Sequence, residues 1–259
     1  MDAINQRRSA VVTGTSGIGL GTALRLAADG FNVILCGIDE KANAAARKQC
    51  GSLAVEVVTL DVSDAEAVAA FAKDLSTLID SLDALVNAAG IQTYGTIETT
   101  TPEDWQRVIS VNLTSCYLMS HCLYPLMKRR KQASIVHVAS VQGHSNQNNV
   151  VGYATTKGAI HALTRAMAVD CARDGIRVNS VSPGSVRTPL LEFSARSLTP
   201  PGGSMEETLD GFGRSHPVGR VGTVEEIAGL IAYLLGPDSA FCTGGDFLID
   251  GGLKAQLGV

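Results

Sequence analysis

A glycine-rich turn near the N-terminus constrains the fold of this chain most. Residues 9–13 (SAVVT) form a short apolar run typical of a buried strand, and the turn at 14–19 (GTSGIG) leads directly into a helical pattern over 20–29. Glycines at such a junction let the backbone approach a pyrophosphate, which then lies at the positive end of the helix dipole. The turn predicts a dinucleotide-binding unit with phosphate contacts from Gly14, Ser16, Gly17, Ile18 and Gly19.

The same alternation of strand and helix continues along the chain. Further strands are predicted at 31–36, 53–62, 83–87, 134–139, 176–181 and 245–250, and helices at 63–79, 102–131, from 153 onward and at 224–235, with Ser63 and Thr223 as N-caps. Strands joined by helices favour a parallel sheet. We expect an α/β fold, a single-domain, doubly wound, Rossmann-like parallel sheet over residues 1–259 with helices on both faces.

Residues 190–216 are the least regular part of the sequence. Two prolines and two glycines at 200–203 divide this segment. Because segments of this length without clear structure are often lids, we predict a substrate loop here, with a disordered surface insertion as the alternative.

Composition excludes several classes of partner. The formal net charge of -4 shows no basic excess for nucleic acid or an anionic membrane. No apolar run approaches the roughly 20 residues of a membrane span, and the N-terminus lacks the apolar core of a signal peptide, so we expect a cytoplasmic protein. The six cysteines lack metal-binding spacing, which predicts reduced buried thiols and no metal site.

Three residues between 140 and 157 indicate a proton-transfer site. Ser140 ends the apolar run 134–139, while Tyr153 and Lys157 lie four residues apart at the start of a helical pattern and therefore on one helix face. A nearby ammonium favours the phenolate, so the phenol can take a proton from an alcohol or return one to a carbonyl. Ser140 can hydrogen-bond the same substrate oxygen. Tyr-x-x-x-Lys is also a common pair on helix surfaces. Spacing alone does not distinguish a proton-transfer site from such a surface pair.

An acidic residue after the second strand bears on the choice of cofactor. Asp39 lies 20 residues after Gly19, where a carboxylate can bind the adenosine ribose and repel a 2′-phosphate. No Arg or Lys occurs in the glycine turn or at 36–40, and Lys41 is the nearest cation, which favours NAD over NADP. The alternative role of Asp39 is an N-cap of the next helix.

Polar and glycine residues recur where the predicted strands end. They are Asp61-Val62, Asn87 to Gly90, Ser140 and the segment 182–189 (SPGSVRTP). The carboxyl ends of parallel strands border the ligand crevice, so these residues should converge on it. Asn112, inside the helix at 102–131, has a solvated or backbone-bonded side chain, or it opens the helical ladder and holds water.

These motifs together resemble the short-chain dehydrogenase/reductase family over nearly the whole chain. The further matching elements are Arg177-Val178-Asn179, Pro183-Gly184, Val186-x-Thr188-Pro189 and Asp250-Gly251-Gly252, and the 13-residue step from Ser140 to Tyr153 is typical of the family. Two elements depart from its pattern. The glycine turn is one residue short, and Ala88 replaces the second asparagine of the Asn-Asn-Ala-Gly element.

The resemblance implies an Asn-Ser-Tyr-Lys tetrad. Tyr153 would be the general acid/base, Ser140 would position the substrate oxygen, Lys157 would lower the tyrosine pKa and bind the nicotinamide ribose, and Asn112 would hold a water on the proton path. The cofactor residues that it implies are Asp61 and Val62 at the adenine, Asn87, Ala88, Ala89 and Gly90 on the adenosine side, and Pro183, Gly184, Val186 and Thr188 at the nicotinamide.

We therefore expect an NAD-dependent oxidoreductase that transfers a hydride between nicotinamide and a secondary alcohol or ketone. Gln142 and His144, in a polar segment beside Ser140, are the predicted substrate contacts and make a sugar or polyol the leading substrate class. The alternatives are a 3-oxoacyl carrier-protein reductase and, in another class, a non-catalytic nicotinamide-binding regulator. The resemblance also implies a homo-oligomer, a dimer or tetramer, assembled through the helices within 102–131 and 150–173.

Overall fold

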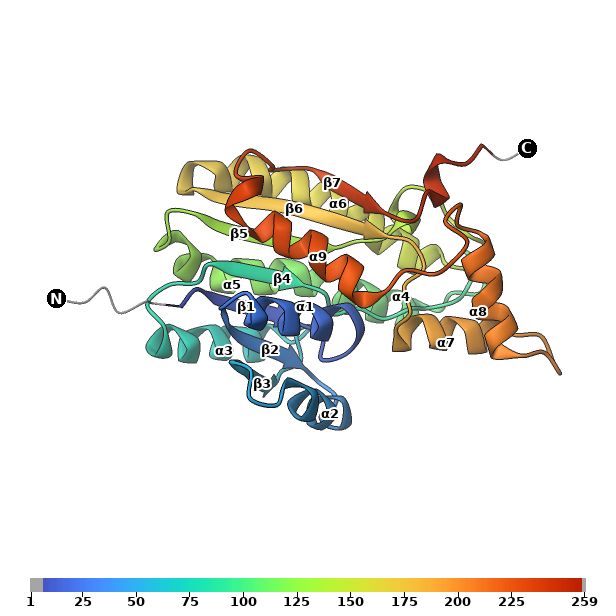
Figure 1. The fold of residues 1–259 in the computed structure, drawn as a ribbon, viewed down its shortest axis with the longest axis horizontal. Coiled ribbons are helices and arrows are strands. Elements are labelled where there is room, and N and C mark those ends of the chain that lie inside the picture. The colour runs from blue at the N-terminus through green and yellow to red at the C-terminus, as the bar shows by residue number, and fades with distance from the viewer. Residues whose placement is uncertain (1–6, 258–259) are drawn as a thin grey trace.

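The computed structural model describes residues 7–257, which are built around a seven-stranded parallel sheet (Figure 1). The strand order is β3-β2-β1-β4-β5-β6-β7. The strands are β1 (Ser9–Thr13), β2 (Asn32–Gly37), β3 (Val55–Thr59), β4 (Ala84–Asn87), β5 (Ala133–Val138), β6 (Ile176–Pro183) and β7 (Asp246–Ile249). The predicted doubly wound α/β sheet is thereby confirmed.

Helices cover both faces of this sheet. They are α1 (Gly17–Ala28), α2 (Glu40–Cys50), α3 (Ala65–Leu78), α4 (Pro102–Ile109), α5 (Ser115–Lys128), α6 (Val151–Cys171), α7 (Pro189–Leu198), α8 (Met205–Arg214) and α9 (Val224–Leu235). One buried apolar cluster joins the sheet to α1, α2 and α9, and the other joins it to α3, α5 and α6. The central strands β1, β4 and β5 are buried at every position, whereas the edge strands β3 and β7 are partly exposed.

The chain reverses its direction of winding between β1 and β4, and a threonine joins the two strand ends there. Thr13 lies opposite Asn87 in the register of these strands. Its hydroxyl accepts hydrogen bonds of 3.0 Å from the backbone N–H groups of Ala88 and Ala89. This contact holds the segment after β4 against the start of the glycine turn.

The long helix predicted at 102–131 is interrupted. A π-helical turn, Ser110–Thr114, separates α4 from α5, and Asn112 lies within it. Of the roles left open for Asn112, the structure shows the opened ladder, and the Asn112 side chain also bonds the backbone of Ile91.

Two local predictions were wrong. Asp64 rather than Ser63 caps α3, because its carboxylate accepts hydrogen bonds from Glu66 N and Ala67 N, while the Ser63 hydroxyl donates to Asp61. The segment 190–216, predicted to be irregular, contains α7 and α8 instead. Thr188 caps α7 through Leu191 N, with Pro189 as the first helical residue, a favourable helix start. Thr223, by contrast, caps α9 as predicted, in a capping box with Glu226.

No helix within residues 7–257 is both long enough and apolar enough to cross a membrane.

A pair of glycines tests how the turn before β6 is packed. Gly175 has φ 73°, and a Cβ there would lie 2.3 Å from the carbonyl oxygen of Lys131, whereas Gly30 has φ 89° with no atom within 4 Å of such a Cβ. Both Gly→Ala variants should lose about 1–2 kcal/mol from left-handed backbone strain.

We expect Gly175→Ala to lose distinctly more free energy of unfolding than Gly30→Ala in urea titrations, because only Gly175 also meets the Lys131 backbone. Equal losses would show that the contact with Lys131 relaxes without cost.

Candidate active site

A cleft of about 640 Å³ lies at the carboxyl ends of the strands. It runs from the glycine turn after β1, past the segments that follow β4, β5 and β6, to α7, α8 and the C-terminal segment. In Figure 1, α7 and α8 lie at the end of the molecule toward which the strand arrows point. The structure therefore puts the cleft where a doubly wound sheet binds its ligands.

The glycine turn has the shape of a phosphate cradle. Gly14 has φ 95°, and a Cβ on Gly19 would lie 2.1 Å from the Gly14 carbonyl oxygen, so no side chain fits at position 19. In the described part of the chain, Ser16 at the N-cap makes no capping hydrogen bond, and the first turn carries no acidic residue. The N–H groups at this helix start suit a dinucleotide pyrophosphate. Gly14, Ser16, Gly17 and Ile18 line the cleft, and Gly19 packs behind them.

The predicted adenosine-side residues divide into two groups. Ala88, Ala89 and Gly90 line the cleft. Within residues 7–257, the cleft lining does not include Asp39, Asp61, Val62 or Asn87.

Each polar member of this second group has a local partner. The Asp39 carboxylate caps α2 through Ala42 N at 2.7 Å, and Asp61 accepts hydrogen bonds from Ser63 N and its hydroxyl. The Asn87 amide is buried 3.1 Å from His137 Nδ1. Their binding roles stay predictions.

Ser140, Tyr153 and Lys157 meet at the cleft as predicted. All three are buried and line it, Ser140 directly after β5 and the other two on α6. The Lys157 ammonium donates to the Val138 carbonyl at 2.8 Å and lies 5.4 Å from the centre of the Tyr153 ring. The Ser140 hydroxyl accepts from Gln142 N at 3.1 Å, which leaves its proton available for a ligand oxygen.

Burial dominates the electrostatics of this group. It raises the pKa of Tyr153 to about 12, with hydrogen bonding to Ser140 acting in the lowering direction and the nearby Tyr94 in the raising direction. Burial also lowers the pKa of Lys157 to about 8, opposed by Cys116. The Lys157 ammonium is directed to the Val138 carbonyl in this structure, and its predicted lowering of the tyrosine pKa stays a prediction.

Asn112 lies behind the cleft rather than in its lining. Its side chain accepts from Ile91 N at 2.8 Å and donates to Ile91 O and the Thr156 hydroxyl. A Cβ on Gly90 would lie 3.4 Å from Asn112 Oδ1 and 3.8 Å from Lys157 Nζ. Both side chains therefore lie on the same side of Gly90. The geometry suits a positioning role, and the proton path through Asn112 stays a prediction.

The two predicted substrate contacts differ in outcome. Gln142 lines the cleft, and its Oε1 atom is buried without a hydrogen-bond partner in the described chain. His144 is not part of the cleft lining within residues 7–257. Its Nε2 atom lies 2.7 Å from the Asp246 carboxylate, and its ring stacks on His161 with ring centres 4.3 Å apart. Gln142 is thus well placed to contact a ligand, whereas the polar atom of His144 is engaged elsewhere.

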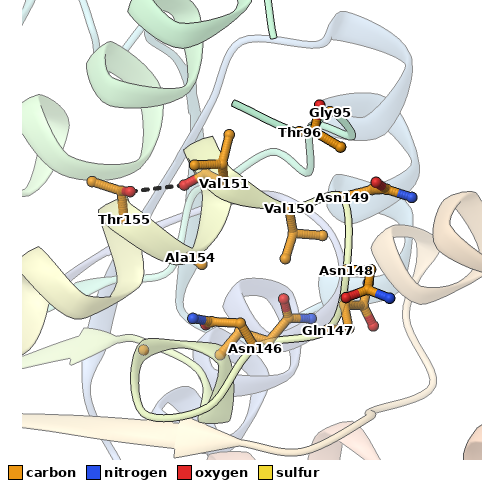
Figure 2. Close-up of a pocket in the computed structure, with 12 residues that line it drawn as sticks. Gly95, Thr96, Asn146, Gln147, Asn148, Asn149, Val150, Val151, Ala154 and Thr155 are labelled. Atoms are coloured by element: carbon orange, nitrogen blue, oxygen red, sulfur yellow. Dashed lines mark hydrogen bonds between the residues drawn. The ribbon is translucent and has the colours of Figure 1, made fainter. Parts of the chain in front are cut away.

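The polar segment between Ser140 and Tyr153 separates this cleft from a second pocket of about 540 Å³ (Figure 2). Gln142, Asn146 and Gln147 line both. Gly95 anchors the far end of the segment, since its N–H donates to Asn149 O at 2.8 Å. Figure 2 shows the start of α6 beside it, where the Thr155 hydroxyl donates to Val151 O.

Several lining residues were missed from the sequence. His216 donates from Nδ1 to Phe212 O at 2.7 Å and accepts from Ser185 N at 3.0 Å, which shapes the turn after β6. Leu190, Leu191 and Phe212 form an apolar wall from α7 and α8, and Lys254 comes from the C-terminal segment. Only the Asp250-Gly251-Gly252 motif hinted at this last contribution.

Comparisons with known proteins agree with this geometry. A family model described as enoyl-(acyl carrier protein) reductase matches residues 12–254. YxbG, an uncharacterized oxidoreductase of Bacillus subtilis, is 37% identical over 260 residues, covering 96% of this chain and 92% of the relative. The chain belongs to the short-chain dehydrogenase/reductase family.

Solved structures of this family share the fold along the whole chain. The aldohexose dehydrogenase of Thermoplasma acidophilum aligns with a TM-score of 0.89 at 32% identity, covering 98% of this chain and 96% of that one. An actinorhodin polyketide ketoreductase solved with NADPH aligns with a TM-score of 0.91 at 30% identity, covering 97% and 99%. The protein is a nicotinamide-dependent oxidoreductase acting on CH–OH groups, and the expectation of an enzyme is confirmed.

Removal of the Tyr153 hydroxyl tests whether this residue is the general acid/base of the enzyme. Tyr153→Phe should lower turnover by about 10²- to 10⁴-fold, the usual contribution of a positioned acid/base, while cofactor binding stays near normal because Lys157 keeps its contact with Val138. Steady-state rates and cofactor titration measure the two effects.

Tyr94→Phe is the matched control, because the Tyr94 hydroxyl is also buried and has no hydrogen-bond partner within residues 7–257. It should leave turnover within a few-fold of the parent. Unchanged turnover in Tyr153→Phe would contradict the assignment of the acid/base.

Proposed function

We propose that this enzyme interconverts a small polar secondary alcohol, such as a sugar or polyol, and the corresponding ketone. The observation that carries the proposal is the meeting of Ser140, Tyr153 and Lys157 in one cleft with the glycine cradle. A nicotinamide bound beside the glycine cradle would supply the hydride acceptor or donor. Tyr153 takes or returns the hydroxyl proton, Ser140 holds the same oxygen, and Lys157 stabilises the ionised site by its charge.

The polar wall of the cleft supports a hydroxylated substrate. A buried acceptor without a partner costs about 1–3 kcal/mol, and a substrate hydroxyl would satisfy the Oε1 atom of Gln142. Asn146 and Gln147 add amide groups to the same wall. The similarity to an aldohexose dehydrogenase fits this substrate class. The apolar wall of Leu190, Leu191 and Phe212 favours the second candidate, a 3-oxoacyl thioester reductase.

A substrate screen decides between these candidates. Polyols and aldoses would be offered with NAD and NADP in parallel, and 3-oxoacyl thioesters with the two reduced cofactors. We expect turnover of at least one polyol or sugar. Efficient turnover of acyl thioesters with none of the polyols or sugars would replace the proposal by the second candidate.

We propose NAD as the preferred cofactor, with NADP as the alternative. Asp39 follows β2 at the start of α2, and the sequence at 36–40 carries no cation that would neutralise a 2′-phosphate. The solved relative with NADPH supports the alternative.

A single change of charge tests this preference. Asp39→Asn keeps an N-cap residue on α2 but removes the negative charge, so the kcat/KM ratio of NADP to NAD should rise by about 3- to 10-fold with little loss of stability. Asp64→Asn, the same change at the N-cap of α3, is the control and should leave the ratio unchanged. A parent enzyme that already prefers NADP would overturn the proposal.

The homo-oligomer implied by the resemblance is also a proposal. Trp105 on α4, Tyr117 on α5 and Val169 on α6 expose 37%, 51% and 76% of their surface, which supports contacts through these helices. Sedimentation as a monomer at micromolar concentration would contradict it.

A further inference from the structure

The cleft is electropositive at the end formed by the C-terminal segment. Besides Lys157, Lys254 is the only Lys or Arg that lines it within residues 7–257, and no Asp or Glu of these residues does so. The Nε2 atom of His216 is engaged within the fold, since it accepts a hydrogen bond from Ser185 N. A substrate in this cleft therefore faces two ammonium groups and no carboxylate.

The fold holds Lys254 in a defined position. The Asp250 carboxylate accepts hydrogen bonds from Gly252 N at 3.0 Å and Lys254 N at 2.8 Å. Gly251 and Gly252 have φ 57° and 85°, so a left-handed turn directs the chain back across the cleft. This turn packs on the segment after α8, since a Cβ on Gly252 would lie 3.0 Å from Pro217 Cγ.

The Lys254 ammonium retains donor capacity. It is half-buried and donates to the Ser145 hydroxyl, and no carboxylate of residues 7–257 forms an ion pair with it. An ammonium has three donors, so two remain for a ligand. Lys157, in contrast, is buried and directed to the Val138 carbonyl.

The chemistry that matches this end of the cleft is a singly charged anion. One ammonium beside a neutral hydroxyl complements the charge and the two oxygens of a carboxylate. A phosphate dianion would keep excess negative charge here, and the described lining offers no arginine fork for it.

We propose that the substrate is a hydroxy acid whose carboxylate binds Lys254 while its secondary hydroxyl lies at Ser140 and Tyr153. This inference rests on the proposed function and names the substrate class of the same site. Oxidation would transfer a hydride from the carbinol carbon to the nicotinamide and the hydroxyl proton to Tyr153, which leaves a ketone. The carboxylate stays unchanged and orients the molecule.

Matched substrates test the role of the charge. The full-length enzyme would be assayed with a panel of hydroxy acids, each paired with its neutral amide, such as gluconate with gluconamide and 3-hydroxybutyrate with 3-hydroxybutyramide. We expect at least one acid to exceed its amide in kcat/KM by about 10- to 100-fold, the range of a charge-assisted hydrogen bond. A polyol phosphate, glucitol 6-phosphate, tests the competing anion.

Variants test whether Lys254 causes the preference for an acid over its amide. Lys254→Met should abolish the advantage of the acid over its amide, mainly through KM, while the urea midpoint stays unchanged, and Lys254→Arg should keep part of the advantage. Lys73→Met, which removes an exposed lysine on α3, is the control for total charge and should keep all of it.

The outcomes separate the two proposals. Equal turnover of acids and amides, an unaffected Lys254→Met, or a preference for the phosphate would overturn this inference and leave the oxidoreductase function standing. Binding of nicotinamide cofactor without oxidation of any hydroxy acid, amide, polyol or sugar would overturn the proposed function itself, and the inference with it.

Discussion

The site depends on one buried threonine hydroxyl at the point where the chain reverses its direction of winding. Thr13 accepts hydrogen bonds from the backbone N–H groups of Ala88 and Ala89, and so joins the end of β1 to the segment after β4. Two surfaces of the cleft, the glycine cradle and the segment 88–90, are held together by this contact. Because the strands are parallel, Ser140 and the turn after β6 end at the same edge of the sheet. The cleft is therefore a consequence of strand order.

Behind this edge, the interruption between α4 and α5 serves the same site. The π-helical turn presents the Asn112 side chain to both the segment after β4, through Ile91, and α6, through Thr156. Three elements far apart in sequence are thus connected beside Lys157. The burial that these contacts create disfavours both the tyrosine anion and the lysine cation, which explains why the pKa values of Tyr153 and Lys157 shift toward their neutral forms.

Much of the fold followed from local patterns, and the errors have physical reasons. Strand positions were predictable because apolar β-branched runs and a glycine turn act over a few residues. The cap of α3 was misplaced by one residue because Ser63 and Asp64 are both good N-caps, and Asp61 engages the serine. The segment 190–216 was misjudged because Pro200 to Gly203 break regular structure in its middle, although they only separate two short helices.

The sequence by itself determined the family, the parallel sheet and the convergence of Ser140, Tyr153 and Lys157, since these rest on short-range spacing and on the ends of strands. Only the tertiary structure decided which polar side chains face the cleft. His144 and Gln142 are two residues apart, yet Asp246, 102 residues after His144, engages the imidazole, while the Gln142 acceptor has no partner among residues 7–257. Lys254 likewise reaches the cleft through a turn held by Asp250. Such contacts join distant parts of the chain, and no local pattern encodes them.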